Sequence, residues 1–399
     1  MQRRTTDGYW REYSETLQNG FKRVTGSAPG VTIAQPGKPE MARFGRYVPR
    51  SEARLHSTAM TTETGSAAET ASSLDARQRV FSGIQPSGLI HLGNDLGAIR
   101  NYVRLQDEYD TPIYCIVDYH ALTSTHDPET LRRGVREMAA GLLALGLDPE
   151  RCILFVQSHR PEHTELAWLF STVTPLSWVE RTPTFKEKRQ TQPDDINHGV
   201  LSYPVLQAAD IAIYKASRVP VGKDQAAHLE LSREIVRAFN NRYGETFPEP
   251  EAVFTEAPVV LGTDGVRKMS KSVGNTIDIL GEPDLIRRQV MSMVTDTQRI
   301  LRTDPGRPEV CNVCQLQPFF GDDYEDLWEG ERTARTGCVD MKRLLGDRIV
   351  NHYAPARERY LELVANPAEV DGVLEAGADQ LRPQAETTLA EVRERMGLR

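Results

Sequence analysis

Short apolar runs alternate with amphipathic stretches between residues 79 and 241 of the chain. The continuous apolar runs at Val80–Phe81, Pro112–Asp118 and Cys152–Val156 predict strands that are buried on both faces. Apolar residues at helical spacing predict a helix over Pro128–Leu145, and a second helix is expected over Pro161–Val173. This alternation predicts an α/β fold with a doubly wound parallel sheet, which binds ligands beyond the carboxyl ends of its strands.

The stretch Arg79–Arg100 runs from an apolar strand end through a glycine-rich turn into a helix with an apolar face. The start of such a helix directs free N–H groups and the positive end of its dipole at the turn, which favours a phosphate ligand. Its glycines fit neither the dinucleotide spacing nor the P-loop spacing. An ordinary strand-to-helix turn is the alternative. The glycines are Gly83, Gly88, Gly93 and Gly97, and the apolar face is Leu92, Leu96, Ile99 and Val103.

Two later stretches carry candidate binding groups. Asp210 is the one carboxylate in the apolar run Tyr203–Tyr214, and burying it without a donor would be costly. A backbone cap, a neighbouring cation or a ligand such as indole, which only donates, would satisfy it. In Arg218–Gln225 a short strand leads through Gly222 into the predicted helix Asp224–Asn241. That turn suits a sugar, although a helix capped by Asp224 explains it equally well.

The loop Arg267–Asn275, with the sequence RKMSKSVGN, places two lysines and two serines within five residues between glycines. Such a loop can close over a polyphosphate. Composition alone leaves a solvated surface turn as the alternative.

These stretches together resemble the tryptophanyl-tRNA synthetases of class I from about Arg79 onward. The carrying strings are GIQPSG, HLGN, YPVLQAADI, VPVGKDQ and KMSKS. The resemblance implies that ATP and L-tryptophan form tryptophanyl adenylate and pyrophosphate, after which tRNA(Trp) receives the tryptophan. It implies a Rossmann-like catalytic domain, ATP as a substrate with Mg²⁺ on its phosphates, and a homodimer with residues 184–202 near its interface.

The resemblance also assigns roles to individual residues. It makes His91, Asn94, Lys268 and Lys271 catalytic, with the two lysines gripping the pyrophosphate. It places around ATP the residues Gln85, Pro86, Ser87, Gly93, Asn94, Gly222, Lys223, Asp224, Val259, Lys268, Met269, Ser270, Lys271 and Ser272, with Gly93 making room for the adenine. It places around tryptophan the residues Asp210, Gln225, Phe81, Val117, His120, Gln207 and Val221, with Asp210 at the indole N–H and Gln225 at the ammonium.

The chain departs from the family pattern at four of these places. Gln207 and His91 stand where methionine and threonine are usual, Lys223 replaces an acid, and Val273 follows the lysine loop in place of aspartate. A synthetase-derived protein that binds tryptophan or its adenylate and acts through a protein partner is therefore an alternative function. A tyrosine-specific relative is a second alternative.

Five cysteines, an odd number, predict no disulfide framework and fit a reducing compartment. Some relatives of the family bind an iron–sulfur cluster through four cysteines. Here Cys311 and Cys314 form a C-x-x-C pair near Cys338, but Glu331 and Met341 stand where two of those cysteines would be. We therefore expect no metal site and no iron–sulfur cluster.

Composition divides the chain into regions. Residues 1–75 are polar and predict a disordered N-terminal extension, for which a protein partner is possible. The catalytic domain is expected at 76–275. By the resemblance, a helical anticodon-binding domain follows at 276–370 and a C-terminal helix at 371–399.

Net charge and hydropathy limit the expected cellular location and the expected classes of binding partner. The net charge of −8 argues against general nucleic-acid binding and leaves room for a local basic patch, for which Arg287, Arg288, Arg299 and Arg302 are candidate phosphate contacts. No apolar run approaches the roughly 20 residues of a membrane helix. We expect a cytoplasmic location and no membrane partner.

Overall fold

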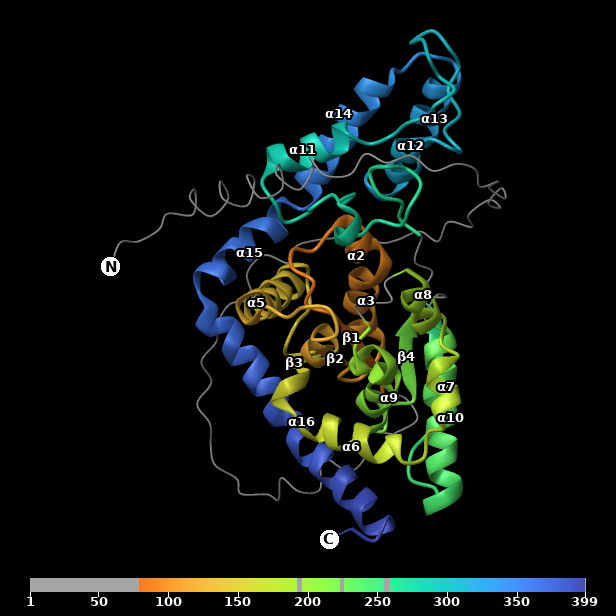
Figure 1. Cartoon of the computed structure of the whole chain (residues 1–399). Coiled ribbons are helices and arrows are strands. Elements are labelled where there is room, and N and C mark those ends of the chain that lie inside the picture. The colour runs from red at the N-terminus through yellow and green to blue at the C-terminus, as the bar shows by residue number, and fades with distance from the viewer. Residues whose placement is uncertain (1–78, 192–195, 223–225, 255–258, 399) are drawn as a thin grey trace, which may run out of the picture. The chain divides into compact units, whose positions relative to one another are not determined.

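The computed structural model describes residues 79–191, 196–222, 226–254 and 259–398 (Figure 1). The predicted extension at residues 1–75 lies outside this range. The described part is α/β, as predicted. Its strands are β1 (Phe81–Ile84), β2 (Ile113–Ile116), β3 (Ile153–Val156), β4 (Arg218–Val221) and β5 (Glu251–Phe254).

All the strand pairs are parallel. β2 lies between β1 and β3, and β4 pairs with β5. A single parallel bridge from Val80 to Arg218 joins the two groups, so the strand order is β3-β2-β1-β4-β5. In this doubly wound order the first strands are added on one side of β1 and the later strands on its other side. The order of the strands therefore reverses between β1 and β4, and the crevice beyond their carboxyl ends is the usual ligand site. The glycine turn after β1 and Gly222 after β4 both lie at that crevice.

Helices connect and cover the strands. The predicted helix at 128–145 is confirmed as α5, whose start is capped by Asp127, the acceptor of a bond from Thr130 N at 2.8 Å. Gly146, with a φ of 108°, follows its end. The helices of this half are α2 (Leu92–Asn94), α3 (Arg100–Glu108), α4 (Asp118–Ala121), α5 (Pro128–Ala144), α6 (Glu162–Ser171), α7 (Leu176–Glu180), α8 (Pro183–Thr191), α9 (His198–Ala212) and α10 (Ala226–Tyr243).

The helix predicted after the glycine turn is interrupted. A π-helical turn, η3 (Asp95–Ile99), lies between α2 and α3. Because a π turn holds more residues than an α turn, it shifts the phase of the buried face. Tyr102 and Leu105 are buried in α3, whereas Val103, predicted on the apolar face, is half-buried.

Five helices lie within residues 283–365, as the pattern predicted, with a non-helical stretch over residues 292–311. A buried hydroxyl ties this region to the half that contains the sheet: Tyr353 OH donates to Asp95 and accepts from Arg100 Nη2 at 3.1 Å. Arg100 Nε also lies 2.7 Å from Asp95 Oδ2. The helices are α11 (Pro283–Met291), α12 (Asn312–Leu316), α13 (Tyr324–Arg332), α14 (Cys338–His352) and α15 (Ala354–Ala365).

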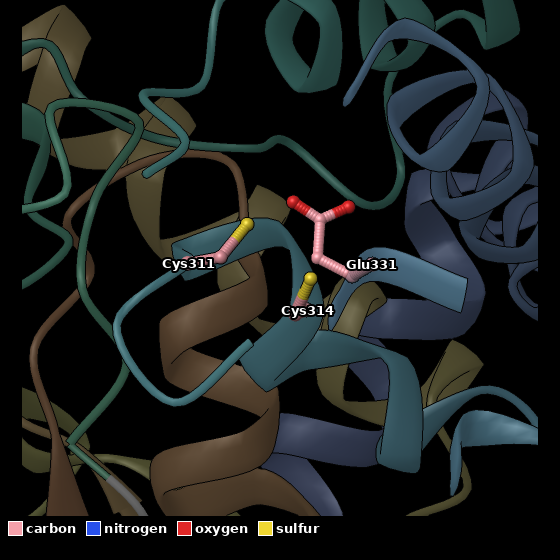
Figure 2. Close-up of side chains that lie close together, drawn as sticks. All are labelled: Cys311, Cys314 and Glu331. Carbon is pink, nitrogen blue, oxygen red and sulfur yellow. The ribbon is translucent and has the colours of Figure 1, made fainter. Parts of the chain in front are cut away.

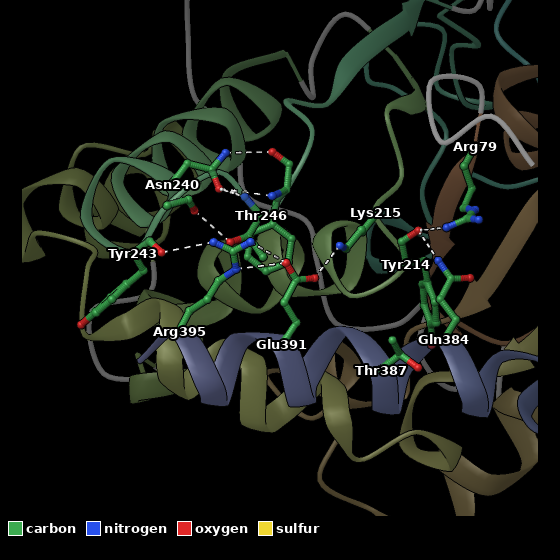
Figure 3. Close-up of polar contacts among 12 residues, drawn as sticks. Arg79, Tyr214, Lys215, Asn240, Tyr243, Thr246, Gln384, Thr387, Glu391 and Arg395 are labelled. Atoms are coloured by element: carbon green, nitrogen blue, oxygen red, sulfur yellow. Dashed lines mark hydrogen bonds and ion pairs between the residues drawn. The ribbon is translucent and has the colours of Figure 1, made fainter. Parts of the chain in front are cut away.

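The C-terminal helix α16 (Pro367–Arg395) returns to the sheet and packs against β3 (Figure 1). A Cβ at Gly377 would lie 2.2 Å from Leu154 O, so helix and strand touch backbone to backbone. Figure 3 shows polar contacts farther along the helix, where Glu391 Oε2 lies 2.7 Å from Lys215 Nζ. Gln384 Nε2 donates to Tyr214 O at 2.7 Å. The helix is thus part of the core around the sheet.

Within the described residues, the helices are all too short or too polar to cross a membrane.

Candidate functional site

The two loops with phosphate-binding character meet beyond β1. Lys271 Nζ donates to Ser87 O at 2.6 Å across 184 residues of sequence. Gly93 N lies 3.3 Å from Met269 Sδ. Leu92 N donates to Ile277 O at 2.8 Å. The contacts hold the residues from Ser87 to Asn94 and the loop from Lys268 to Ser272 on one surface, so the predicted juxtaposition of these loops is confirmed.

His91 begins α2 and is buried. Its Nδ1 accepts from Asn94 N at 3.2 Å, while Asn94 Oδ1 accepts from His91 N at 3.2 Å. Burial, and then the charges of Lys271 and Lys268, lower the pKa of His91 to about 4. The ring is therefore neutral at pH 7 with its proton on Nε2, because Nδ1 is an acceptor. One N–H of the ring thus remains to donate to a ligand.

Gly93 allows a close approach, but the closest group is a side chain of this chain. A Cβ at Gly93 would lie 3.1 Å from Met269 Cβ and 3.1 Å from His91 Nδ1. Met269 therefore packs at Gly93, where the resemblance placed the adenine of ATP. That placement stays a prediction.

The lysine loop is folded as a short turn. Ser270 N donates to Asn275 Oδ1 at 2.7 Å, and Gly274, with a φ of 73°, ends the turn η7 (Lys271–Val273). Burial lowers the pKa of Lys271 to about 8, and the nearby carboxylates of Asp278 and Glu137 only partly offset this. An anion bound beside Lys271 would raise this pKa again and so favour the charged ammonium.

Asp210 in α9 is buried, and the chain itself supplies its donors. His120 Nε2 lies 2.7 Å from Oδ2, while Gln157 Nε2 at 2.6 Å and His163 Nδ1 at 2.7 Å reach Oδ1. Burial raises the pKa of Asp210, but the charge and hydrogen bond of His120 and the bond from His163 outweigh it and lower the pKa to about 2. The sequence suggested a backbone cap, a neighbouring cation or a ligand as the donor, and the structure shows two histidines and a glutamine in that role.

Gln157 and His163 are residues that sequence reasoning missed. The string QSHRPEH directly after β3 was the available pattern, since polar residues at the carboxyl end of a parallel strand mark a ligand edge. His163 Nε2 also lies 2.7 Å from Tyr214 OH. An ionised carboxylate has about four acceptor positions, so Asp210 keeps one for a further donor.

The other residues predicted around the aromatic substrate lie near this network to different degrees. The buried ring of Phe81 stacks on Tyr214, with centroids 5.9 Å apart. Val117, also buried, directly precedes α4, which carries His120. Gln207 and Val221 are half-buried.

The remaining ATP-site predictions lie at the rim of the crevice or outside the described residues. Gln85 and Ser87 are exposed and Pro86 is buried, with Pro86 O 2.6 Å from where a Cβ at Gly134 would stand. Gly222 is half-buried, and Val259 is 72% exposed. Lys223, Asp224 and Gln225 fall outside the described residues, as do residues 255–258 next to Val259.

One of the four arginines proposed as phosphate contacts is wrong for that role. Arg299 is buried with its Nη1 2.7 Å from Glu331 Oε2, so it cannot meet a nucleic acid. Arg287 pairs with Asp347, at 2.8 Å. Arg288 and Arg302 are exposed.

A second group of side chains has the chemistry of a metal site. The Sγ atoms of Cys311 and Cys314 and a carboxylate oxygen of Glu331 all lie within 4.8 Å of one another, and all three residues are buried (Figure 2). This group is remote in sequence from both phosphate loops. Its residues are those for which no metal was expected.

Comparisons with known proteins agree with the site. The sequence profile of the family described as tRNA synthetases class I (W and Y) matches residues 73–354. A tryptophan–tRNA ligase of Deinococcus radiodurans is 46% identical over 325 residues, which are 80% of this chain and 98% of the relative. One of Thermotoga maritima is 44% identical over 326 residues, 80% of this chain and 99% of the relative.

Solved structures agree as well. Tryptophanyl-tRNA synthetase of Campylobacter jejuni, complexed with ADP and tryptophan, has a TM-score of 0.74 and 38% identity, and the match covers 80% of this chain and 100% of that one. The chain belongs to the class I tRNA synthetases of the tryptophan and tyrosine group.

Proposed function

We infer that the chain is a tryptophan–tRNA ligase, which activates L-tryptophan with ATP and transfers it from the adenylate to tRNA(Trp). The observation that carries this inference is the contact between the two phosphate loops, where Lys271 Nζ meets Ser87 O at 2.6 Å. Relatives 46% and 44% identical are named for this activity. The first step releases pyrophosphate, so a site that gathers lysines and a helix start at one crevice favours the transition state by positioning and charge neutralisation.

We propose that ATP lies between the two loops. The N–H of the neutral His91 ring donates to a phosphate oxygen, and Lys268 and Lys271 neutralise the leaving pyrophosphate. Lysine suits this task because its ammonium is a compact point charge on a flexible stem. Gln85, Ser87 and Asn94 add donors, while Gly222 and Asp224 hold the ribose. Mg²⁺ bound to the phosphates would add positive charge there.

Tryptophan lies, on this proposal, in the pocket lined by Phe81, Val117 and His120, with its indole N–H on the remaining acceptor position of Asp210. Gln207 and Val221 border the ring, and Gln225 meets the ammonium. A site built to accept a buried N–H rejects an amino acid that lacks one, because the acceptor is then left unpaired. This predicts strong discrimination against phenylalanine.

Other parts of the proposal concern partners and location. Residues 276–370 would form the anticodon-binding domain, and the exposed Arg288 and Arg302 are the candidate phosphate contacts that fit it. A homodimer is supported by the large apolar side chains of Trp168 and Leu176, which are 71% and 61% exposed on α6 and α7. The enzyme would work in the cytoplasm, and residues 1–75 would meet a protein partner.

Two measurements on the full chain test the function. Tryptophan-dependent exchange between ATP and pyrophosphate tests activation, and charging of tRNA(Trp) tests transfer. We expect both with tryptophan and neither with tyrosine. Exchange without charging would indicate a protein that makes the adenylate but is not a ligase. Tyrosine activity would assign the chain to the other specificity of its family.

A further inference from the structure

The cluster of Cys311, Cys314 and Glu331 combines residues from two consecutive helices of the C-terminal half, and Cys338 stands at the start of the next. Cys311 caps α12, Cys314 lies within it, Glu331 lies near the end of α13, and Cys338 begins α14. The structure brings the first three polar groups within 4.8 Å of one another in a buried place. Figure 2 shows the two sulfur atoms and the carboxylate directed into one space.

We propose that Cys311, Cys314 and Glu331 bind a single divalent cation of the thiolate-preferring class, which zinc represents, and that Cys338 is available as the fourth ligand. Two thiolates and a carboxylate are ordinary zinc ligands. Tetrahedral bonds of about 2.0–2.3 Å set ligand atoms roughly 3.5–3.8 Å apart. Cys338 Sγ lies 3.9 Å from Glu331 Oε1, close to that separation. Cys338 lies outside the group whose ligand atoms are all within 4.8 Å of one another, so its side chain has to turn toward the ion to serve as the fourth ligand.

The donor set does not fit an iron–sulfur cluster. Such clusters are held by four thiolates, or by thiolates with histidine in one class. Here a carboxylate stands among the thiols. Met341 stands at a second position where a cluster would require a cysteine, and it is buried and has no ionisable group. A mononuclear ion is the group these residues fit.

The charge of the surroundings favours a divalent ion. The ionised side chains of Cys311, Cys314 and Glu331 carry three negative charges, and a divalent ion leaves one negative charge. Arg299, with 1% of its side chain exposed, supplies the balancing positive charge through Nη1, which is 2.7 Å from Glu331 Oε2. The three ligands, the ion and Arg299 together carry no net charge, which avoids the cost of burying an isolated ion, whereas an ionised Cys338, which is only half-buried, would add one negative charge.

Arg299 also acts as a positioning residue for the carboxylate. Its Nη2 donates to Arg302 O at 2.9 Å, so the guanidinium is fixed at both ends. One carboxylate oxygen of Glu331 is held by the arginine, and the other remains for the ion. Outer partners of this kind orient ligands and raise metal affinity.

The ion would join α12 and α13 and, through Cys338, also α14. Structural zinc sites supply folding energy to small regions with little core of their own. The inference concerns this helical segment and does not depend on the proposed function.

The test is the metal content of the full chain. The chain is purified without chelators under reducing conditions, and its metals are measured by inductively coupled plasma mass spectrometry. We expect about one zinc per chain. The double variant Cys311→Ser with Cys314→Ser should lose the ion, and Glu331→Gln should bind it at least about tenfold more weakly. Cys152→Ser, which removes a buried thiol elsewhere, is the matched control and should keep the ion.

A second measurement keeps the proposal testable if the variants misfold. The chelated wild-type chain is titrated with cobalt, and thiolate-to-cobalt charge-transfer bands at one equivalent support the site. A chain that binds neither zinc nor cobalt with its thiols reduced overturns the proposal. Iron with an equal amount of acid-labile sulfide, or a Cys311–Cys314 disulfide in the purified chain, overturns it as well. None of these outcomes depends on aminoacylation.

Discussion

Replacing Asp210 by asparagine tests the buried network at the aromatic pocket. The asparagine amide keeps the shape of the side chain but removes the negative charge that His120, Gln157 and His163 surround. The pKa of Asp210 is about 2 against 3.8 for an unperturbed carboxyl. That difference is worth about 2 kcal/mol, since one pKa unit is about 1.4 kcal/mol. We expect Asp210→Asn to lower the free energy of unfolding by about 2 kcal/mol at neutral pH.

The pH dependence has a defined sign. Because the pKa is lower in the folded chain, this stability is present above about pH 4 and is lost as the pH falls toward about 2. Urea unfolding of wild type and variant should therefore differ at pH 7, and the difference should shrink in acid. Activity gives an independent reading, because an indole N–H loses its anionic acceptor. We expect kcat/KM for tryptophan in the exchange reaction to fall roughly 100-fold, from a loss of about 3 kcal/mol.

Asp284→Asn, at an exposed acid on α11, is the control and should change neither quantity. An Asp210→Asn variant of wild-type stability would refute the argument that the three donors stabilise the ionised carboxylate. A stable variant with unchanged preference for tryptophan over phenylalanine would refute the placement of the indole.

Three further predictions concern other contacts. Since the pKa of Lys271 is about 8, the KM for ATP should rise as the pH passes above about 8, and Lys271→Arg should remove that rise because guanidinium stays charged. Tyr353→Phe should lower stability by about 1–2 kcal/mol in urea and slow exchange, because it removes a buried hydroxyl that joins the helical region to the turn after the first phosphate loop. Gly377→Ala should cost about 1–3 kcal/mol, because its Cβ would meet a β3 carbonyl at 2.2 Å, whereas Gly372→Ala, with open space, should be neutral or stabilising.

Much of the fold follows from the sequence because the spacing of apolar residues and the residues that bound each segment indicate the same elements. The apolar runs Pro112–Asp118 and Cys152–Val156 became the parallel strands β2 and β3, and the helical spacing of apolar residues over Pro128–Leu145 became α5. The π-helical turn after Asn94 was not predicted, and its first residue, Asp95, accepts from the hydroxyl of Tyr353, 258 positions away, a contact that no local pattern indicates.

The candidate site was predicted where its motifs are local and missed where its parts come together by folding. The two phosphate loops were recognisable, but that Met269 would pack at Gly93 follows only from the approach of the loops. The donors of Asp210 come from α4 and from the segment after β3. The sequence therefore indicated that Asp210 needs donors but did not identify these residues as the donors. Arg299 reads as an exposed cation until α13 places Glu331 against it.

A crystal structure of the full chain with ATP and tryptophan tests the central claim most directly. We predict the polyphosphate between the ring of His91 and the ammonium groups of Lys268 and Lys271, with the indole nitrogen within hydrogen-bonding distance of Asp210. A triphosphate bound away from the two loops, or an indole ring turned from that carboxylate, would contradict the account.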